Sequence, residues 1–168
     1  SIITDERQKS FVNSILVAGR NLLMLLNDIL DLSKIEAGKI ELDPSPVDLR
    51  VICNEIKQIF SLKSSEKKLS FNVTHSSDLT ELLYLDEVSI RQIILNLVGN
   101  AIKFTDKGSV SITTQIEAKY ENSVDLVISV SDTGIGIPIK DQEKVFNSFE
   151  QQSNQDVIKY GGTGLGLS

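Results

Sequence analysis

The sequence predicts an α+β protein, a two-layer sandwich of helices over one sheet, preceded by a long helix. Three observations indicate this class. Apolar residues between positions 11 and 32 recur at spacings of four and three, which is a helical seam. Two segments between residues 109 and 131 alternate apolar and polar side chains with the period of a strand. Amphipathic stretches after Asp48 and Asp86 supply the helical layer.

The N-terminal helix is expected to end near Gly38 and to belong to a helical bundle. Its seam consists of Phe11, Ile15, Ala18, Leu22, Leu25, Ile29 and Leu32. A second apolar stripe beside the seam gives a face that suits a four-helix bundle better than a two-stranded coiled coil. Pro44 and Pro46 oppose continuation of the helix, so we divide the chain into residues 1–39 and residues 40–168.

The sandwich is expected to begin with a helix that Asp48 caps. The predicted inner face of this helix is Leu49, Ile52, Ile56, Ile59 and Phe60. Strands follow at 69–74 and 82–85, and Asp86 caps a second helix. The predicted inward residues of that helix are Ile90, Ile93, Ile94, Leu97 and Ala101. The two strands with alternating apolar and polar residues are expected to form an antiparallel hairpin. A third helix is expected after Pro138, with Val145, Phe146 and Phe149. Residues 150–159 are expected to form a mobile loop.

Composition limits the classes of partner. The formal net charge of −6 opposes a nucleic-acid partner, because phosphate binding needs a concentrated basic face. Lys63, Lys67 and Lys68 form a local basic group, which we interpret as a solvated helix end. The single cysteine, Cys53, excludes an internal disulfide and is expected to be buried. The sequence has no apolar run long enough to cross a bilayer, so we expect a cytoplasmic chain without membrane contact.

Asn96, Asn100 and Lys103 follow one stripe of the second sandwich helix. Mg²⁺ takes oxygen ligands and relies on substrate phosphates for charge, so neutral carboxamides suit it. Lys103 could hold a phosphate as a point charge. The alternative is a plain amphipathic helix with its polar side in water.

Asp132 follows an apolar strand and begins the turn Asp-Thr-Gly-Ile-Gly. A carboxylate buried at a strand end is a strong acceptor for an exocyclic amine, which distinguishes adenine from guanine. Gly134 and Gly136 permit positive φ and remove Cβ atoms that would hold a base away. The alternative is an ordinary turn.

The glycine run of residues 161–168 could wrap phosphates, but two familiar motifs are excluded. A P-loop requires Lys after Gly166, where Leu167 stands. A dinucleotide fingerprint would continue Gly162 and Gly164 with a third glycine, and Leu167 occupies that position too. We call Asn96, Asn100 and Lys103 the carboxamide stripe. Together with this stripe and the turn that begins at Asp132, the glycine run indicates a site for a magnesium–nucleotide complex.

The order and spacing of these motifs resemble the ATP-binding domain of sensor histidine kinases. That domain belongs to the GHKL superfamily with DNA gyrase B, Hsp90 and MutL. The N box is similar to residues 96–105, the first glycine box to 132–136, the F box to 146–149 and the second glycine box to 162–166. Residues 26–39 resemble the second helix of the dimerisation and phosphotransfer hairpin, and their sequence is typical of hybrid kinases.

The resemblance implies the Bergerat (GHKL) fold for residues 40–168, with ATP and Mg²⁺ as cofactors. Asn100 would be the principal Mg²⁺ ligand, Asn96 would assist, Lys103 would contact phosphate, Phe104 would pack near the base and Asp132 would bind the adenine amine. The implied nucleotide-binding residues are Asn96, Asn100, Lys103, Phe104, Asp132, Gly134, Gly136, Gly162, Thr163, Gly164, Leu165 and Gly166. The segment between the F box and the second glycine box would be a lid over the phosphates.

The implied activity is transfer of the γ-phosphate of ATP to a histidine on a dimerisation helix that is absent from this chain. The sole histidine, His75, is expected to be structural or solvent-facing. The family continues past Leu167 with a helix and strands, so we expect a piece of a larger protein that could be membrane-anchored. The implied partners are ATP or ADP, a second copy bound through the N-terminal helix, and the receiver domain of a response regulator.

Two other functions stay open. A nucleotide-binding signalling or docking module would transfer no phosphate, and the intact Asn100, Lys103 and Asp132 count against a degenerate pocket. An ATP hydrolase of the same superfamily would need a general base, for which Glu87 and Glu55 are the nearest helical carboxylates. The sequence of residues 32–36 resembles that of kinases and therefore favours a kinase over the docking module and the hydrolase.

Overall fold

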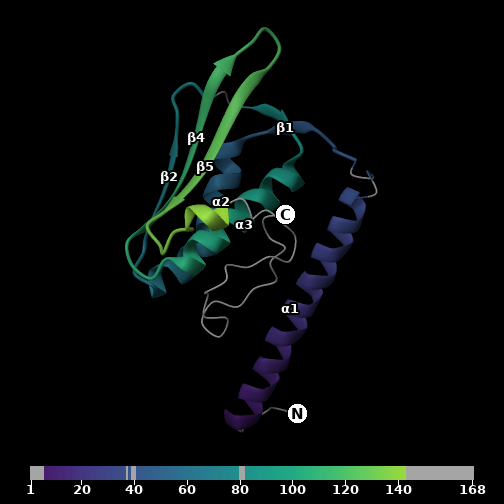
Figure 1. The fold of residues 1–168 in the computed structure, drawn as a ribbon, viewed down its shortest axis with the longest axis vertical. Coiled ribbons are helices and arrows are strands. Elements are labelled where there is room, and N and C mark those ends of the chain that lie inside the picture. The colour runs from purple at the N-terminus through teal and green to yellow at the C-terminus, as the bar shows by residue number, and fades with distance from the viewer. Residues whose placement is uncertain (1–5, 37, 39–40, 80–81, 143–168) are drawn as a thin grey trace. The chain divides into compact units, whose positions relative to one another are not determined.

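The structure, a computed structural model, describes residues 6–36, 38, 41–79 and 82–142 (Figure 1). It divides into two compact units, Ser1–Glu41 and Leu42–Ser168, which are described separately below. The predicted third helix with Val145, Phe146 and Phe149, the predicted mobile loop and the second glycine box lie outside the described residues.

The first unit is a single helix, α1 (Glu6–Glu36), as the seam predicts. Large apolar side chains on α1 are exposed, among them Phe11 (59%), Ile15 (70%) and Leu22 (60%). Gly38 follows with φ +61°, the left-handed conformation common just past a helix end. No helix in the described parts of the chain is both long and apolar enough to span a membrane.

The second unit contains two small sheets where the sequence predicted one. β1 (Ser45–Val47) pairs antiparallel with β3 (Leu83–Leu85). β2 (Ser70–His75), β4 (Ser109–Lys119) and β5 (Val124–Asp132) form a three-stranded sheet in the order β2-β4-β5. The predicted β4–β5 hairpin is confirmed as antiparallel. β2 and β4 pair in parallel, which requires the long crossover that β3 and the following helix provide.

Two helices, α2 (Leu49–Glu66) and α3 (Glu87–Phe104), cover one face of this sheet (Figure 1). Both predicted caps are confirmed, because the side chain of Asp48 accepts from the backbone N–H of Arg50 at 2.9 Å and that of Asp86 accepts from Ser89 at 2.7 Å. A short helix, α4 (Ile139–Gln142), comes after the turn that follows β5.

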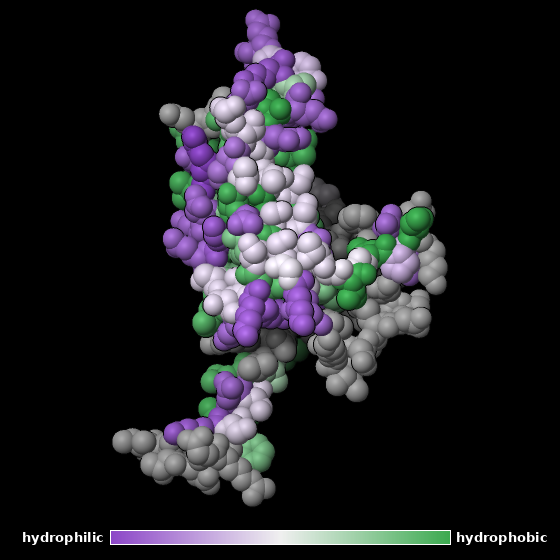
Figure 2. Space-filling model, turned by 90° about the vertical axis from the view of Figure 1, so that its left-hand side faces the viewer, coloured by the Kyte–Doolittle hydropathy of each residue, from purple (hydrophilic) through white to green (hydrophobic). Residues whose placement is uncertain are grey.

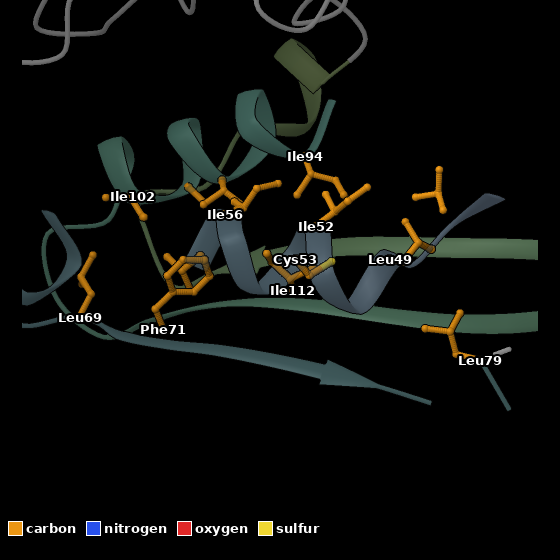
Figure 3. Packing of buried hydrophobic residues seen from close by; sticks show 14 residues of the cluster. Leu49, Ile52, Cys53, Ile56, Leu69, Phe71, Leu79, Ile94, Ile102 and Ile112 are labelled. Carbon is orange, nitrogen blue, oxygen red and sulfur yellow. The ribbon is translucent and has the colours of Figure 1, made fainter. Parts of the chain in front are cut away.

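The core lies between the two helices and the sheet (Figure 3). It comprises Val47, Leu49, Ile52, Cys53, Ile56, Leu69, Phe71, Leu79, Ile94, Val98, Ala101, Ile102, Val110 and Ile112. The predicted inward positions Ile59 and Ile93 are wrong, since their side chains are 61% and 53% exposed. On α3 the fully buried places belong to Ile94, Val98 and Ile102, a strict i, i+4, i+8 row.

The opposite face of the three-stranded sheet is more polar. Figure 2 looks onto this side, and white and purple side chains spread over much of it. The alternation along β4 explains the pattern, because Val110 and Ile112 face the core while Thr113 and Gln115 are exposed. A helical layer is therefore needed on one face only.

Candidate nucleotide site

The carboxamide stripe lies on the side of α3 that turns away from the sheet. Asn96 and Asn100 each come two positions after a core residue, Ile94 and Val98, which is roughly 200° around a helix. Both asparagines and Lys103 are half-buried, so their polar groups are held partly out of water. Packing of the apolar row thus determines where the polar row points.

Gln92 extends this stripe by one turn toward the N-terminus of α3. Its Nε2 donates to Oδ1 of Asn96 at 3.4 Å. Sequence reasoning missed Gln92, although its i−4 spacing from Asn96 was the available signal. The hydrogen bond orients the amide of Asn96. Asn100 lies one turn further toward the carboxyl end of the helix.

Lys103 occupies a partly desolvated place at the end of α3. Its Nζ lies 4.7 Å from the centroid of the Phe104 ring, within cation–π range. Burial lowers the pKa of Lys103 from its ordinary value, and the positive charge of Lys63 lowers this pKa further. An ammonium group held this way is suited to pair with an anionic ligand.

Asp132 lies beside the end of α3, at the end of β5. Its Oδ1 accepts from the backbone N–H of Gly134 at 2.8 Å and from Oγ1 of the fully buried Thr105 at 3.5 Å. Two donors on one oxygen fix the direction of the carboxylate. The expected burial of Asp132 is wrong, because the residue closes its strand at the rim of the sheet and is exposed.

The two glycines of the turn serve different purposes. A Cβ atom on Gly134 would lie 2.5 Å from the carbonyl oxygen of Phe104 and 2.9 Å from Oγ1 of Thr105. Gly134 is therefore required by close packing against the end of α3. Gly136 has open space around it but adopts φ +69°, so it supplies backbone freedom.

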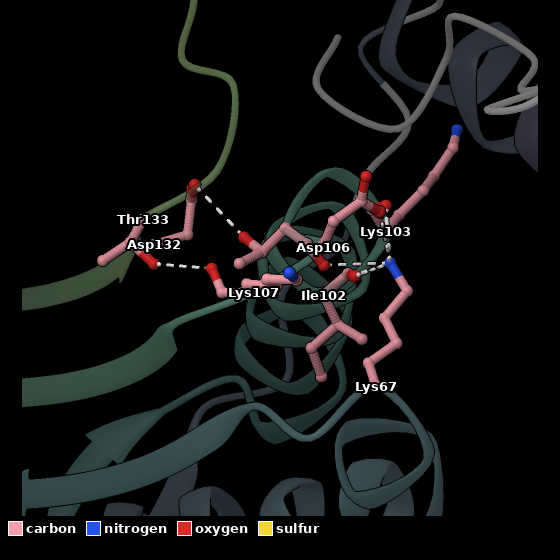
Figure 4. A network of polar contacts seen from close by, with 8 residues as sticks. Lys67, Ile102, Lys103, Asp106, Lys107, Asp132 and Thr133 are labelled. Carbon is pink, nitrogen blue, oxygen red and sulfur yellow. Dashed lines mark hydrogen bonds and ion pairs between the residues drawn. The ribbon is translucent and has the colours of Figure 1, made fainter.

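Thr133 ties the turn to the segment that follows α3. Its N–H donates to the carbonyl oxygen of Ser109 at 3.1 Å, and its Oγ1 accepts from the N–H of Ser109 at 3.0 Å. The same hydroxyl donates to the carbonyl oxygen of Lys107 at 3.3 Å (Figure 4). Gly108, at φ +112°, leaves no room for a Cβ beside that hydroxyl. Thr105 and Thr133 were not identified from the sequence as residues that hold the turn in place, although Thr105 ends the N box and Thr133 lies in the first glycine box.

Lys67 corrects the interpretation of the basic group as a solvated helix end. Its ammonium donates to the carbonyl oxygens of Ile102, Lys103 and Thr105 at 2.7, 3.0 and 3.0 Å (Figure 4). The sequence carried no signal for this contact, because the two helices are brought together only by the tertiary fold.

The remaining candidates are held by structural contacts. Nδ1 of His75 lies 2.7 Å from Oγ1 of Thr114, in a half-buried place that agrees with a structural histidine. Cys53 is fully buried as predicted, and burial raises the pKa of its thiol to about 11. Glu55 and Glu87 both bind the guanidinium of Arg91, each at 2.7 Å, so both candidate bases are already engaged in ion pairs.

This combination of fold and rim defines the class of protein: a domain of helices over a mixed sheet, with a polar helix stripe joined to an Asp-x-Gly-x-Gly turn. The profile of the family described as histidine kinase-, DNA gyrase B-, and HSP90-like ATPase matches residues 85–168. That stretch contains α3, β4 and β5 and all the residues of the carboxamide stripe and the Asp132 turn. The chain belongs to this ATPase family.

Histidine kinases are among the relatives that match most of the chain. The signal transduction histidine-protein kinase BarA of Escherichia coli K12 is 39% identical over 160 residues, which cover 95% of this chain and 17% of BarA. The crystal structure of full-length ShkA in complex with AMPPNP is 33% identical with a TM-score of 0.80, covering 99% of this chain and 33% of that one. A nucleotide-free catalytic domain of the histidine kinase ThkA is 28% identical with a TM-score of 0.60, covering 75% of this chain and 76% of that one.

Proposed function

We propose that the chain is the ATP-binding catalytic portion of a two-component sensor histidine kinase. It would transfer the γ-phosphate of ATP to a histidine on a dimerisation helix outside this chain. The observation that carries the proposal is the joint between α3 and the turn after β5, where Thr105 and Gly134 orient Asp132 and Gly134 packs against the backbone of Phe104. ATP binding also agrees with the AMPPNP complex of ShkA.

The donor set of α3 fits Mg²⁺ bound to a nucleotide. Asn100 would be the principal ligand and Asn96 would assist, because neutral carboxamide oxygens suit a hard cation whose charge is balanced by phosphates. Bound Mg²⁺ would neutralise charge on the phosphates. Lys103 would bind a phosphate oxygen, and its partly buried place strengthens that attraction.

The turn after β5 would recognise the adenine base. With Oδ1 of Asp132 held by two donors, the second carboxylate oxygen would accept from the exocyclic amine of adenine. Guanine presents a carbonyl oxygen at that edge and would be repelled. Phe104 would pack near the base, and Gly136 would let the backbone approach it. The phosphates would be covered by Gly162, Thr163, Gly164, Leu165 and Gly166.

Phosphoryl transfer in this arrangement depends on positioning and charge neutralisation. His75 is a poor acceptor, because Thr114 holds one ring nitrogen and the other is buried. The acceptor would therefore come from another helix, carried by a dimer formed through α1. A receiver domain would take the phosphoryl group onward, and this part of the protein would work in the cytoplasm.

A transfer assay tests the proposal. The chain is incubated with Mg–ATP and a separately supplied phosphotransfer hairpin of the parent protein, and acid-labile phosphate on the hairpin is measured. We expect weak transfer, since the tether that raises effective concentration is missing, and no label on the chain itself. Asn100→Ala should abolish transfer, whereas Asn72→Ala, at an exposed position on β2, should not. ATP binding without any transfer would instead favour the non-catalytic signalling module.

A further inference from the structure

Lys67 reaches from the end of α2 to the end of α3. Its Nζ contacts three backbone carbonyl oxygens, those of Ile102, Lys103 and Thr105, all within 3.0 Å (Figure 4). Oδ1 of Asp106 lies 3.8 Å from the same atom. An ammonium has three N–H donors, so the three carbonyls account for all of them.

The contact meets a specific need of α3. The last carbonyls of a helix lack partners within it, and their partial negative charge favours a cation nearby. α3 passes at Thr105 directly into extended backbone, with φ −106° and ψ +117°, and so lacks the glycine turn that often caps such an end. Lys67 supplies the missing donors from a different helix.

The backbone of α2 aims Lys67 at this place. Lys68 adopts φ +55°, its N–H donates to the carbonyl oxygen of Ser65 at 2.9 Å, and the N–H of Leu69 donates to Ser64 at 2.8 Å. These bonds end α2 sharply, and the Lys67 side chain is left only 29% exposed. The turn is thus fixed by backbone contacts of its own, which are separate from those that the ammonium makes.

The segment that Lys67 holds is the segment that builds the site. Lys103 carries the ammonium expected to bind phosphate, the carbonyl of Phe104 accepts from Ile135 at 3.4 Å, and Thr105 donates to Asp132. We propose that Lys67 is a positioning residue of the nucleotide site, which fixes the end of α3 so that Lys103 and Asp132 keep their relative geometry. The ligand named in the test rests on the proposed function.

The variant Lys67→Met removes the charge and the donors while keeping most of the side-chain length. Its control is Lys57→Met, an exposed lysine on the same helix. Calorimetric titration with Mg–ADP should show affinity about tenfold weaker for Lys67→Met, equivalent to about 1.4 kcal/mol, and unchanged for the control. Amide hydrogen exchange should accelerate at residues 103–106 and stay slow at the core residues of α2.

A purely structural role would lower the midpoint of unfolding without changing the affinity of folded molecules. Affinity within about twofold of the control, or exchange that accelerates uniformly, would therefore overturn the proposal. If Lys67→Met does not fold, Lys67→Arg replaces it, because a planar guanidinium keeps the charge but cannot reach three carbonyls in the same way. That variant should bind several times more weakly than wild type, and equal affinity would overturn the proposal. Failure of wild type to bind Mg–ADP would contradict the proposed function instead.

Discussion

At the scale of single residues, the site is held together by contacts that the identities of the motif residues do not reveal. Gly134 packs against the carbonyl oxygen of Phe104, and Thr105 donates to Asp132 from a fully buried position. These two contacts join segments about thirty residues apart in the chain, so small changes there should affect binding as strongly as changes in the groups that face the ligand.

Replacing Gly134 by alanine should be costly. The added Cβ would meet backbone and buried atoms closer than 3.0 Å, so the turn must shift away from α3. We expect a loss of roughly 1–3 kcal/mol in the free energy of unfolding by urea, and weaker binding of Mg–ADP. Gly19→Ala, in the open middle of α1, should instead be neutral or stabilising. Equal effects of the two substitutions would show that the close approach is absent in solution.

His75 should make stability depend on pH near neutrality. Burial lowers the pKa of His75, and the positive charge of Arg50 lowers it further, although Asp48 acts in the opposite direction. The unfolded chain therefore binds more protons, and stability present above the unfolded pKa is lost as pH falls through it toward the folded value. Urea unfolding at about pH 7.5 and about pH 5.5 should show a larger drop for wild type than for His75→Gln. Because the chain has one histidine, identical drops would contradict this role.

At the scale of elements, the apolar row of α3 decides where its polar row lies. The sequence located α2, α3 and the β4–β5 hairpin because caps and periodicity are local signals. It wrongly placed Ile59 and Ile93 in the core. The apolar stripe on each helix is wider than the surface that packs against the rest of the domain, and the sequence does not show which edge of the stripe is buried. It missed Lys67 and the parallel β2–β4 pair, since both depend on contacts between segments more than thirty residues apart.

The left-handed turn at the end of α2 can be tested directly. Lys68 adopts φ +55°, a conformation that glycine tolerates better than residues with a Cβ. Lys68→Gly should raise the free energy of unfolding by roughly 0.5–1 kcal/mol in urea titrations. Lys57→Gly, in the body of the same helix, should lower it by about 1 kcal/mol. A loss of stability in both variants would argue against the positive φ.

Exposed apolar residues on α1 should drive association. Ile15 and Leu22 lie seven positions apart on the predicted seam and are 70% and 60% exposed. Such a face favours contact with a second copy, in agreement with the proposed dimerisation helix. Ile15→Asp with Leu22→Asp should give monomers by light scattering, whereas Ser14→Asp should not change the mass. An unchanged mass in the double variant would locate the contact elsewhere.

At the scale of the whole molecule, the fold brings two sequence motifs together, because the end of α3 contacts the turn that follows β5. Order and spacing in the sequence were sufficient to name the family. The geometry of the rim was not predictable, because Thr105, Thr133 and Lys67 each bind a segment that lies far away in the sequence. The exposure of Asp132 likewise depends on where β5 ends relative to the helices.

The joint between α3 and the turn after β5 is proposed to bind a magnesium–adenine nucleotide. Calorimetric titration of the chain with ADP and with GDP, each in the presence of Mg²⁺, tests it most directly. We predict that ADP binds at least about tenfold more tightly than GDP, and that Asp132→Asn removes most of this preference, because an acceptor is partly replaced by a donor facing the amine. Equal affinity for the two nucleotides, or equal affinity of wild type and Asp132→Asn for ADP, would show that this joint does not recognise adenine.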